Sequence, residues 1–543
     1  MTRRVPALAA ALFALAALAL APWSRDFPLN DDWIYSLPVK NLLEHGTLQL
    51  FDTLKTQVLQ IGWGWLWAKA FGFSLGALKM STLCLGAASV WVFAKLLLKL
   101  KVEPRAAFLG AFCLAFNPLF FSLSVSFMTE IPYLFMLLLS VWFFAAEEER
   151  PAALWASSLS AAGAALIRPT GLLAPAGFSP ALLRGRGPVV RKLLIIWLPA
   201  LAALAGWWLW ARAPEASHVS GSALNINSEA FNYWRRPLWV LLETLRRLLS
   251  GVFLYGLFLL PFAAVFALRP GFFKGVRENR RAFYIMAAIM ILAGFHILLA
   301  GRAPLPGNGN SIYRTGLGYV TIYGYTAKAS GILGWGIFWP LAAALSMLSA
   351  GVLAAEFASL KNLPGAAKTC LIVFALQFAF VLAAPRFFDR YFIYALPAAL
   401  IAAALAARAI PISAPALFCG GALALFSWAG TADYLAWNGA KWEAAARAAK
   451  HGIAPEEVAG GFDYDAWHTY ERRMAELKSV KNAAPIGEWD WADLSAKKAA
   501  VVFVPPPGSE NDVLEKVAYR TPLAPFSRGS VYLLKISFRK TGK

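Results

Sequence analysis

Residues 5–33 read VPALAAALFALAALALAPWSRDFPLNDDW, an apolar run up to Trp23 followed by a short polar stretch that contains two adjacent carboxylates. The run up to residue 22 is long enough to cross a lipid bilayer as a helix. Two carboxylates at the edge of a membrane are unfavourable unless they are solvated, paired or used by the protein. The stretch therefore predicts a membrane span that delivers Asp31 and Asp32 to one membrane surface.

The composition of the whole chain is that of a membrane protein. Of its 543 residues, 59% are hydrophobic and only 15% are charged, whereas a soluble domain carries about 25% charged residues. These values exclude a large soluble enzyme and also a disordered chain, which would be poor in apolar residues. The four cysteines lie inside apolar stretches and are interpreted as small core residues, neither disulfides nor metal ligands.

The net charge of +21 does not indicate a nucleic-acid partner. The Lys and Arg residues are spread between the apolar segments and form no continuous basic face. In a protein with many membrane spans, such residues orient loops toward the cytoplasm and attract anionic membrane lipids or phosphate-bearing substrates.

Apolar windows of roughly 17 to 25 residues predict about thirteen membrane spans. They lie near residues 5–22, 75–97, 106–121, 131–146, 152–167, 170–183, 193–211, 250–268, 283–300, 332–355, 367–384, 391–408 and 412–430. For the first span the alternative is a signal peptide cleaved near Ala21, but we favour an uncleaved helix because many spans follow. The segment 56–72 contains three tryptophans and is assigned to an interfacial helix, because tryptophan favours membrane interfaces.

These assignments predict which segments lie on each side of the membrane. The basic loops and the N-terminus fall on the cytoplasmic side, and the odd number of spans places the C-terminus outside. The non-cytoplasmic segments are then residues 23–74, the surroundings of Glu130, and residues 212–249, 301–331 and 384–390. We expect a multi-pass protein of the plasma (inner) membrane.

After residue 430 the composition changes abruptly, because acidic residues, lysine and histidine return. Residues 440–451 have the pattern of an amphipathic helix, and residues 501–504 and 531–538 that of strands. We therefore predict an all-α polytopic bundle over residues 1–430, whose outer loop 23–74 carries interfacial helices. Residues 431–543 are predicted to form a small α/β domain on the non-cytoplasmic (periplasmic) side.

Three acidic residues are candidates for chemistry on the outer side. Asp31 and Asp32 follow the first span directly, where a general base would meet both a lipid headgroup and a water-borne acceptor. The alternative is that Asn30 or Asp31 only caps a helix that ends at Gly46. Glu130 lies at the outer mouth of two spans, and its alternative role is a favourable interaction with a helix dipole.

Arginines on the same side are candidates for binding phosphate. Arg386 and Arg390 lie in the stretch RFFDRY, and paired arginines suit bidentate phosphate binding. The alternative for them is interfacial snorkelling together with an Arg–Asp pair. Arg168 lies at an outer turn in a very apolar region, and for it a phosphate contact and an anchor of the bundle interior are both open.

No Walker A motif and no strand-linked dinucleotide fingerprint occurs in the sequence. The apolar bulk also offers no cytosolic domain that would hold a nucleotide sugar. A site on the outer side must therefore receive an activated substrate that is already in the membrane. A sugar carried on a polyprenyl phosphate meets this requirement.

The sequence resembles the GT-C superfamily of polytopic glycosyltransferases, and most closely its protein O-mannosyltransferase clan and the bacterial aminoarabinose transferase of lipid A. The resemblance covers residues 5–200 and 385–400 at the level of motifs, and the stretches DYLAW (433–437) and GFDY (461–464) look like the tails of bacterial members. The matching motifs are Asn30-Asp31-Asp32, Glu44-His45-Gly46, the Trp-rich segment, Glu130, Arg168-Pro169, Arg390-Tyr391 and Pro397.

The resemblance implies an inverting transfer of a sugar from polyprenyl phosphate to an acceptor hydroxyl on a lipid, glycan or protein. Asp31 matches the family's first-loop catalytic acid, and Glu130 matches the acid of the second outer loop. The family usually has Glu after the first acid, whereas this sequence has Asp32, so either Asp31 or Asp32 is the expected base. Glu130 would orient the acceptor or assist the base.

In this hypothesis the arginines stabilise the charge that develops on the leaving phosphate. The expected phosphate-binding residues are Arg390, Arg386 and Arg168, and the expected cleft residues are Arg302, Tyr313, Arg314 and Tyr391. No cofactor is assigned. A divalent cation between Asp31 and Glu130 is left open, because two carboxylates do not identify a metal.

Two other classes of protein compete with this hypothesis. A lipid flippase or transporter needs polar groups along a path through the membrane, and midspan candidates such as Gln377 and His296 are few. A non-catalytic assembly protein would need one membrane anchor and not many spans. In the C-terminal region, His468 with Asp463 and Asp465 is a weaker candidate for a metal site.

Overall fold

The structure is a computed structural model. For residues 292–300 and 474–479 it describes the backbone but not the side chains. It describes residues 2–48, 50, 56–147, 150, 152–185, 188–211, 231–300, 311–313, 315–322, 331–407, 410–479, 496–525 and 528–536.

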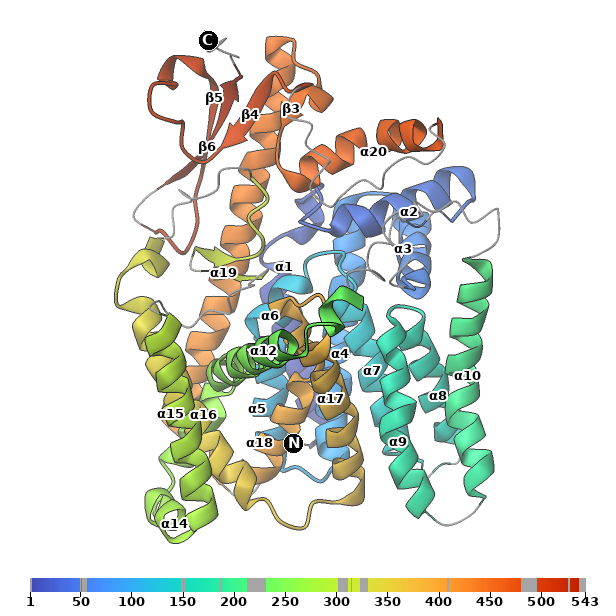
Figure 1. The fold of residues 1–543 in the computed structure, drawn as a ribbon, viewed down its shortest axis with the longest axis vertical. Coiled ribbons are helices and arrows are strands. Elements are labelled where there is room, and N and C mark those ends of the chain that lie inside the picture. The colour runs from blue at the N-terminus through green and yellow to red at the C-terminus, as the bar shows by residue number, and fades with distance from the viewer. Residues whose placement is uncertain are drawn as a thin grey trace.

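A bundle of helices, most of which run along the long axis of the molecule, makes up most of the chain (Figure 1). Its members are α1 (Val5–Leu18), α4 (Leu75–Lys99), α5 (Pro104–Ala115), α7 (Glu130–Phe144), α8 (Ala152–Ala165), α9 (Leu173–Arg184), α10 (Val189–Trp210), α15 (Arg280–Ala300), α16 (Phe338–Ser359), α17 (Gly365–Ala383), α18 (Leu396–Ala406) and α19 (Ala414–Ala446). The core lies around α4, which packs on α1, α5 and α7 and buries Phe93 and Leu97 completely.

A helix lies at every predicted span, and the chain is a membrane protein. Among the described residues, six helices are long and apolar enough to cross a membrane, or seven if one bent pair counts as a span. The predicted total of about thirteen is not confirmed, because several of the helices have only 11 to 15 residues, as α7 and α18 do. At 1.5 Å per residue, such helices are shorter than the hydrocarbon core of a bilayer.

Two predicted spans are broken, and proline explains both breaks. The predicted span 250–268 is instead the end of α12 (Pro237–Phe258) and α13 (Leu260–Ala267), which are bent by 70° where Pro261 begins the second helix. The predicted span 106–121 is α5 followed by α6 (Pro118–Leu123), whose first turn is capped by the Asn117 side chain. Proline lacks the N–H that would continue the preceding helix, and it is favoured at the start of the next one.

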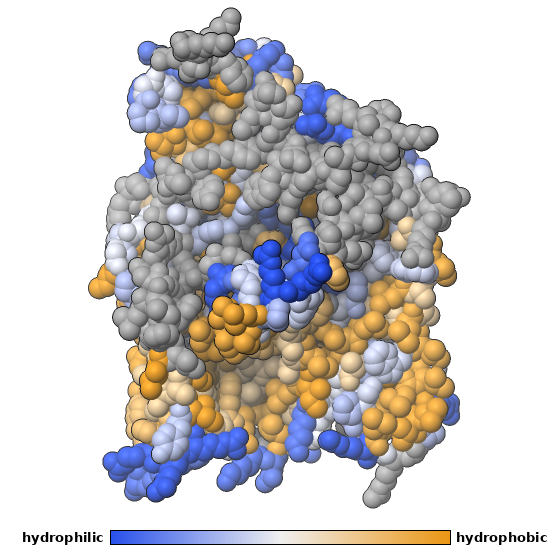
Figure 2. Space-filling model, viewed as in Figure 1, coloured by the Kyte–Doolittle hydropathy of each residue, from blue (hydrophilic) through white to orange (hydrophobic). Residues whose placement is uncertain are grey.

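The apolar surface of the bundle faces outward, as a lipid environment requires. Figure 2 shows an apolar region that covers much of the lower half of this face and ends at hydrophilic residues near α14 (Phe272–Glu278). On α10, Leu194 and Leu198 are about half exposed. In water this surface would be strongly unfavourable, whereas lipid tails solvate it.

Short helices cover the other end of the bundle. There α2 (Asp32–His45) packs on α3 (Val58–Phe71). The predicted end of α2 is confirmed, because Gly46 has φ +67° and donates its N–H to the carbonyl of Leu42, a conformation that favours glycine. Helix α3 has 14 residues and contains the predicted tryptophans, and its placement at the membrane interface stays a prediction.

The C-terminal region adds a small α/β unit at the same end (Figure 1). Helix α20 (Phe462–Ser479) accompanies the strands β3 (Val458–Ala459), β4 (Ala499–Val502), β5 (Val513–Tyr519) and β6 (Gly529–Lys535). The sheet order is β3-β4-β6-β5, with β3 and β4 parallel and the other pairs antiparallel, and Val501 lies opposite Leu533.

The C-terminal unit is continuous with the bundle. The predicted strands 501–504 and 531–538 overlap β4 and β6 in part, and the predicted helix 440–451 is the end of α19 followed by the 3-10 turn Arg447–His451. The predicted domain boundary at residue 430 therefore lies inside α19. Trp437 on this helix packs edge-on against Phe503, with ring centroids 5.5 Å apart, so α19 packs directly on the C-terminal unit.

Candidate functional site

The predicted acid Asp31 is paired with the predicted arginine Arg390. Asp31 is the residue before α2, and its carboxylate makes no capping hydrogen bond to that helix. Instead, Asp31 Oδ2 lies 2.8 Å from Arg390 Nη2. Asn30, with φ +51°, turns the chain sharply just before it, and Asn is one of the few residues that tolerate this conformation. The Asp31 side chain therefore pairs with Arg390 and does not cap α2.

Glu130 joins the same pair from another part of the chain. It is the first residue of α7 and is fully buried. Its Oε1 lies 3.2 Å from Arg390 Nε and 2.7 Å from Arg168 Nη2. Asp31, Glu130, Arg168 and Arg390 thus form one cluster of two acids and two arginines, which we call the charged network. Charges that are removed from water need such partners.

Aromatic rings and a threonine complete the surroundings of Arg168. Arg168 Nε donates to Thr129 Oγ1 at 3.1 Å, and its guanidinium lies 5.1 Å from the Tyr391 ring centroid and 5.3 Å from that of Tyr394. Contacts of this kind stabilise an arginine that has lost its water. They fit an anchor of the bundle interior, while the contact with Glu130 keeps Arg168 connected to the charged network.

Asp32 occupies a different environment from its neighbour Asp31. Its Oδ1 accepts the Phe127 N–H at 3.0 Å and its Oδ2 accepts the Leu29 N–H at 3.2 Å. The side chain is fully buried, and this burial raises the pKa of Asp32 to about 7, against the opposing effect of Lys79. Asp32 therefore ties the loop that follows α1 to the loop that precedes α7.

Arg390 is held in place by the residue before it. Asp389 is buried in the 3-10 helix Asp389–Tyr394, and its carboxylate accepts the N–H groups of Ser311 and Ile312 at 2.9 and 2.8 Å. Arg390 itself is only 2% exposed, so snorkelling to water does not describe it. Arg386, four residues earlier, is exposed.

The remaining predicted cleft residues are only partly covered by the structure. Tyr391 is half-buried beside Arg168 and Arg390, at 5.1 and 5.8 Å from the two guanidinium carbons. Tyr313 lies in β1 (Ile312–Tyr313), next to the residues that Asp389 holds. Arg302 and Arg314 lie outside the described residues.

A small cavity of about 30 Å³ with a mixed lining adjoins the charged network, and we call it the polar cavity because Arg390 and several hydroxyl groups border it. It is bordered by Asn30 and Arg390, by serines of α6 and of the loop that follows it, and by Tyr434 of α19. Its full lining is Leu29, Asn30, Ser122, Leu123, Ser126, Met128, Ser311, Gly318, Tyr319, Arg390 and Tyr434. This volume holds about one water molecule, so a sugar enters only if the surrounding loops move.

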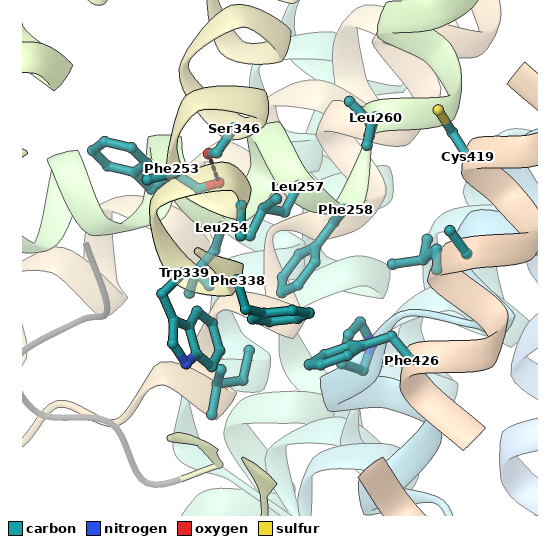
Figure 3. Close-up of a pocket in the computed structure, with 16 residues that line it drawn as sticks. Phe253, Leu254, Leu257, Phe258, Leu260, Phe338, Trp339, Ser346, Cys419 and Phe426 are labelled. Atoms are coloured by element: carbon teal, nitrogen blue, oxygen red, sulfur yellow. Dashed lines mark hydrogen bonds between the residues drawn. The ribbon is translucent and has the colours of Figure 1, made fainter. Parts of the chain in front are cut away.

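An apolar cavity of about 150 Å³ lies next to the polar one. Figure 3 shows aromatic side chains from α12, α16 and α19 around it, and the rings of Phe338 and Phe426 are stacked with centroids 6.4 Å apart. Residues that are close in the chain border the two cavities, since α6 contributes Pro118 to the apolar cavity and Ser122 to the polar one. In the same way, Ile312 lines the apolar cavity and Ser311 lines the polar one.

The acidic residues of the site do not fit a metal ion as they are arranged. Arg390 contacts both Asp31 and Glu130, and Arg168 contacts Glu130, so two guanidinium groups already neutralise the two carboxylates that are the possible cation ligands. In the part of the chain that the structure describes, no group of three His, Cys, Asp or Glu residues is placed to hold a metal. Asp463 and Asp465 are paired with Lys441 and Lys497, and His468 packs against Tyr464.

Several residues that build this site were not predicted from the sequence. Asp389 was seen only as a partner for an arginine, whereas it binds backbone N–H groups. Thr129 and Tyr394 were not singled out, although they stand next to Glu130 and close after Arg390 in the sequence. Buried Lys79, which donates to the carbonyls of Arg25 and Phe27, offered one signal: it is a lone lysine inside a predicted span.

The fold and the charged network define a polytopic helical membrane protein with a buried charged site at one end of its bundle. No protein-family model matches the sequence, and no curated protein sequence matches it significantly. Among solved structures, it is similar to ArnT from Cupriavidus metallidurans bound to undecaprenyl phosphate, at 12% identity and a TM-score of 0.39. That match covers 96% of this chain and 97% of ArnT.

Two further structures are similar at the same low level. The archaeal oligosaccharyltransferase AglB from Archaeoglobus fulgidus is 12% identical with a TM-score of 0.38, over 92% of this chain and 69% of AglB. The S. cerevisiae protein O-mannosyltransferase complex Pmt1-Pmt2 is 17% identical with a TM-score of 0.32. That match covers 38% of this chain and 32% of the mannosyltransferase chain. A protein O-mannosyltransferase is thus among the matches, as the sequence resemblance predicts. These matches transfer no residue role to this chain.

Proposed function

We propose that the protein is an integral-membrane glycosyltransferase that moves a sugar from a polyprenyl-phosphate donor to an acceptor hydroxyl on the non-cytoplasmic face. The contact between Asp31 and Arg390 is the observation that carries this proposal. It brings together a carboxylate able to accept a proton and a guanidinium able to bind phosphate. Both belong to segments that the sequence places outside the membrane.

The two cavities match the two chemical parts of such a donor. The polar cavity lies against Arg390 and is bordered by hydroxyl groups, which suit a phosphate and a sugar. The adjoining apolar cavity is lined by aromatic and aliphatic side chains, which suit the first isoprene units of a lipid tail. In this proposal the lipid tail occupies the apolar cavity and the phosphate lies at Arg390, beside the polar cavity.

In the proposed reaction, Asp31 removes the proton of the acceptor hydroxyl while the acceptor oxygen attacks the anomeric carbon. The bond between that carbon and the phosphate oxygen breaks, and polyprenyl phosphate leaves with the electron pair. Attack from the face opposite the phosphate inverts the anomeric configuration. Arg390 binds the additional negative charge on the leaving phosphate, and Glu130, which contacts both Arg168 and Arg390, orients the two arginines.

The ion pair between Asp31 and Arg390 implies an order for the steps of this reaction. A carboxylate held by an arginine is a poor proton acceptor, because the positive charge stabilises its ionised form. A donor phosphate that binds Arg390 replaces Asp31 as its partner and leaves the carboxylate available to the acceptor. Arg168 is a further candidate for a contact with the phosphate, whereas Arg386 is exposed and is expected to contribute little.

The test is transfer by the purified protein in nanodiscs, with a polyprenyl phosphate that carries a radiolabelled sugar and with cell-envelope extract as acceptor. We expect labelled product with the anomeric configuration opposite to that of the donor. Asp31→Asn protein provides the inactive control. Movement of the lipid-linked sugar across proteoliposomes without transfer would contradict the proposal and would favour the flippase alternative.

A further inference from the structure

The outer loop that closes the polar cavity is held by the C-terminal region. This loop, residues 311–322 without the undescribed residue 314, contains β1 and β2 (Gly316–Leu317), and we call it the outer hairpin. One end is fixed to Asp389, through the N–H groups of Ser311 and Ile312. Gly318 packs so closely on the Tyr434 ring that a Cβ atom would lie 2.2 Å from it.

A buried ion pair fixes the other end of the outer hairpin. Lys441 Nζ donates to Thr321 Oγ1 at 2.8 Å and to Asp463 Oδ2 at 2.6 Å. Lys441 and Asp463 are both fully buried, and Thr321 is nearly so. A lone buried charge is strongly unfavourable, so each member of the pair needs the other. The lysine therefore joins α19, α20 and the hairpin at one point.

The backbone beside this pair also binds the hairpin. The Phe462 N–H donates to the Thr321 carbonyl at 3.0 Å. Gly461 has φ +102°, and a Cβ atom there would lie 2.5 Å from the same carbonyl. Only glycine combines this conformation with so close an approach. We call Lys441, Gly461, Phe462 and Asp463 the C-terminal clamp.

The clamp reaches the acidic side of the site as well. Trp33 directly follows Asp32 and is fully buried, and its ring packs edge-on against Phe462 and Tyr470 at 5.9 and 6.2 Å. Phe27 stacks on Trp442, which is next to Lys441, with centroids 6.3 Å apart. The loop that carries Asp31 and the hairpin beside Arg390 are thus held by the same few C-terminal residues.

We propose that the C-terminal clamp is a positioning device that sets the distance between the Asp31 loop and the outer hairpin over the polar cavity. Lys441 and Asp463 are its positioning residues. The expected effect on the donor KM rests on the proposed function, whereas the expected effect on the positions of the two loops does not. It assigns the C-terminal region a part in the site, beyond that of an appended domain.

The test compares two buried lysines that form ion pairs in the same region. Lys441→Met breaks the clamp. Lys497→Met breaks the ion pair between Lys497 Nζ and Asp465 Oδ1, which lie 2.9 Å apart and are equally buried. Among the described residues, Lys497 bonds only to Asp465 and to the carbonyls of Glu456 and Val458, none of which belongs to the outer hairpin. Amide hydrogen exchange is measured on peptides that cover residues 29–33 and 315–322, and the donor KM is measured in parallel.

We expect Lys441→Met to speed exchange in both peptides about tenfold and to raise the donor KM about tenfold, since loss of one partner of a buried pair is strongly destabilising nearby. Lys497→Met should leave both peptides and the KM as in the wild type. Thr321→Val, which keeps the ion pair, should speed exchange only in residues 315–322. Wild-type exchange in Lys441→Met, or equal effects of Lys441→Met and Lys497→Met on the hairpin, would overturn the proposal. Hydrogen exchange is measured without substrate. If the protein transfers no sugar, the proposed function is refuted, but the exchange data still test the C-terminal clamp.

Discussion

Asp31 and Arg390 are 359 residues apart in the chain, and their side chains meet at 2.8 Å in a buried pair. Glu130 contacts the same arginine through its Nε atom, at 3.2 Å. A membrane protein has little reason to bury this arrangement for stability alone, because well-packed apolar residues are often as stabilising as a buried ion pair. The pair is therefore the most informative point at which to test the proposed function.

The first prediction concerns the proton acceptor. Asp31→Asn removes the negative charge and keeps the shape of the side chain, so it should lower kcat at least about 100-fold, at the low end of effects of a general base. Binding of polyprenyl phosphate should persist, since Arg390 is retained. Turnover and lipid binding are measured on the same purified protein. Normal turnover in Asp31→Asn would remove the general base from the mechanism.

The second prediction concerns the phosphate. Arg390→Lys keeps the charge but loses the planar fork that binds two oxygens at once, so it should raise the donor KM about tenfold. Arg386→Lys is the matched control from the same motif, and because Arg386 is exposed it should change the KM less than about threefold. Equal effects of the two substitutions would place the phosphate outside the buried network.

The third prediction concerns Asp32 and pH. Its pKa is raised by burial from 3.8 to about 7, so the folded state binds a proton that the unfolded chain has released. The contribution of Asp32 to stability is therefore complete at low pH and is lost as the pH rises toward 7. Between pH 5.5 and 8 the wild type should lose about 2 kcal/mol relative to Asp32→Asn.

Thermal unfolding of both proteins in the same detergent at the two pH values provides the measurement. Asp32→Asn should be the less stable of the two at pH 5.5 and should approach the wild type at pH 8. A difference that does not change with pH would mean that Asp32 stays ionised throughout, held by Lys79.

The fourth prediction concerns the sides of the membrane. The C-terminal unit lies at the same end of the bundle as α2, which begins directly after Asp31 (Figure 1). If that end is outside, alkaline phosphatase inserted at Gly508, in a turn of the C-terminal unit, should be active in cells. Inserted at Gly185, after α9, it should be inactive. The opposite pattern would place the site in the cytoplasm and contradict a lipid-linked donor on the outer face.

Much of the fold could be predicted from the sequence, because apolar periodicity is a local property. A helix lies at every predicted span, and α2 ends at Gly46 as expected. The breaks at Asn117 and Leu259 were not predicted, although Pro118 and Pro261 mark them. An apolar window averages over one proline, whereas the backbone responds to the single missing N–H.

The sequence alone determined that the chain crosses membranes, and it identified Asp31, Glu130, Arg168 and Arg390 as unusual charges. It did so because a charge beside an apolar run is unfavourable whatever the fold. Only the tertiary structure decided between neighbours of equal chemistry. It turns Asp31 toward Arg390 and Asp32 toward backbone N–H groups, since successive side chains leave a helix start in different directions.

The same distinction applies to Arg386 and Arg390 and to the buried pair of Lys441 and Asp463. Which arginine of one motif is buried, and which lysine meets which aspartate, depends on contacts between segments that are far apart in the chain. Residue type and spacing carry no record of those contacts. Burial makes each such pairing specific, because in a medium without water only the partner that is actually in contact compensates for the lost hydration of a charge.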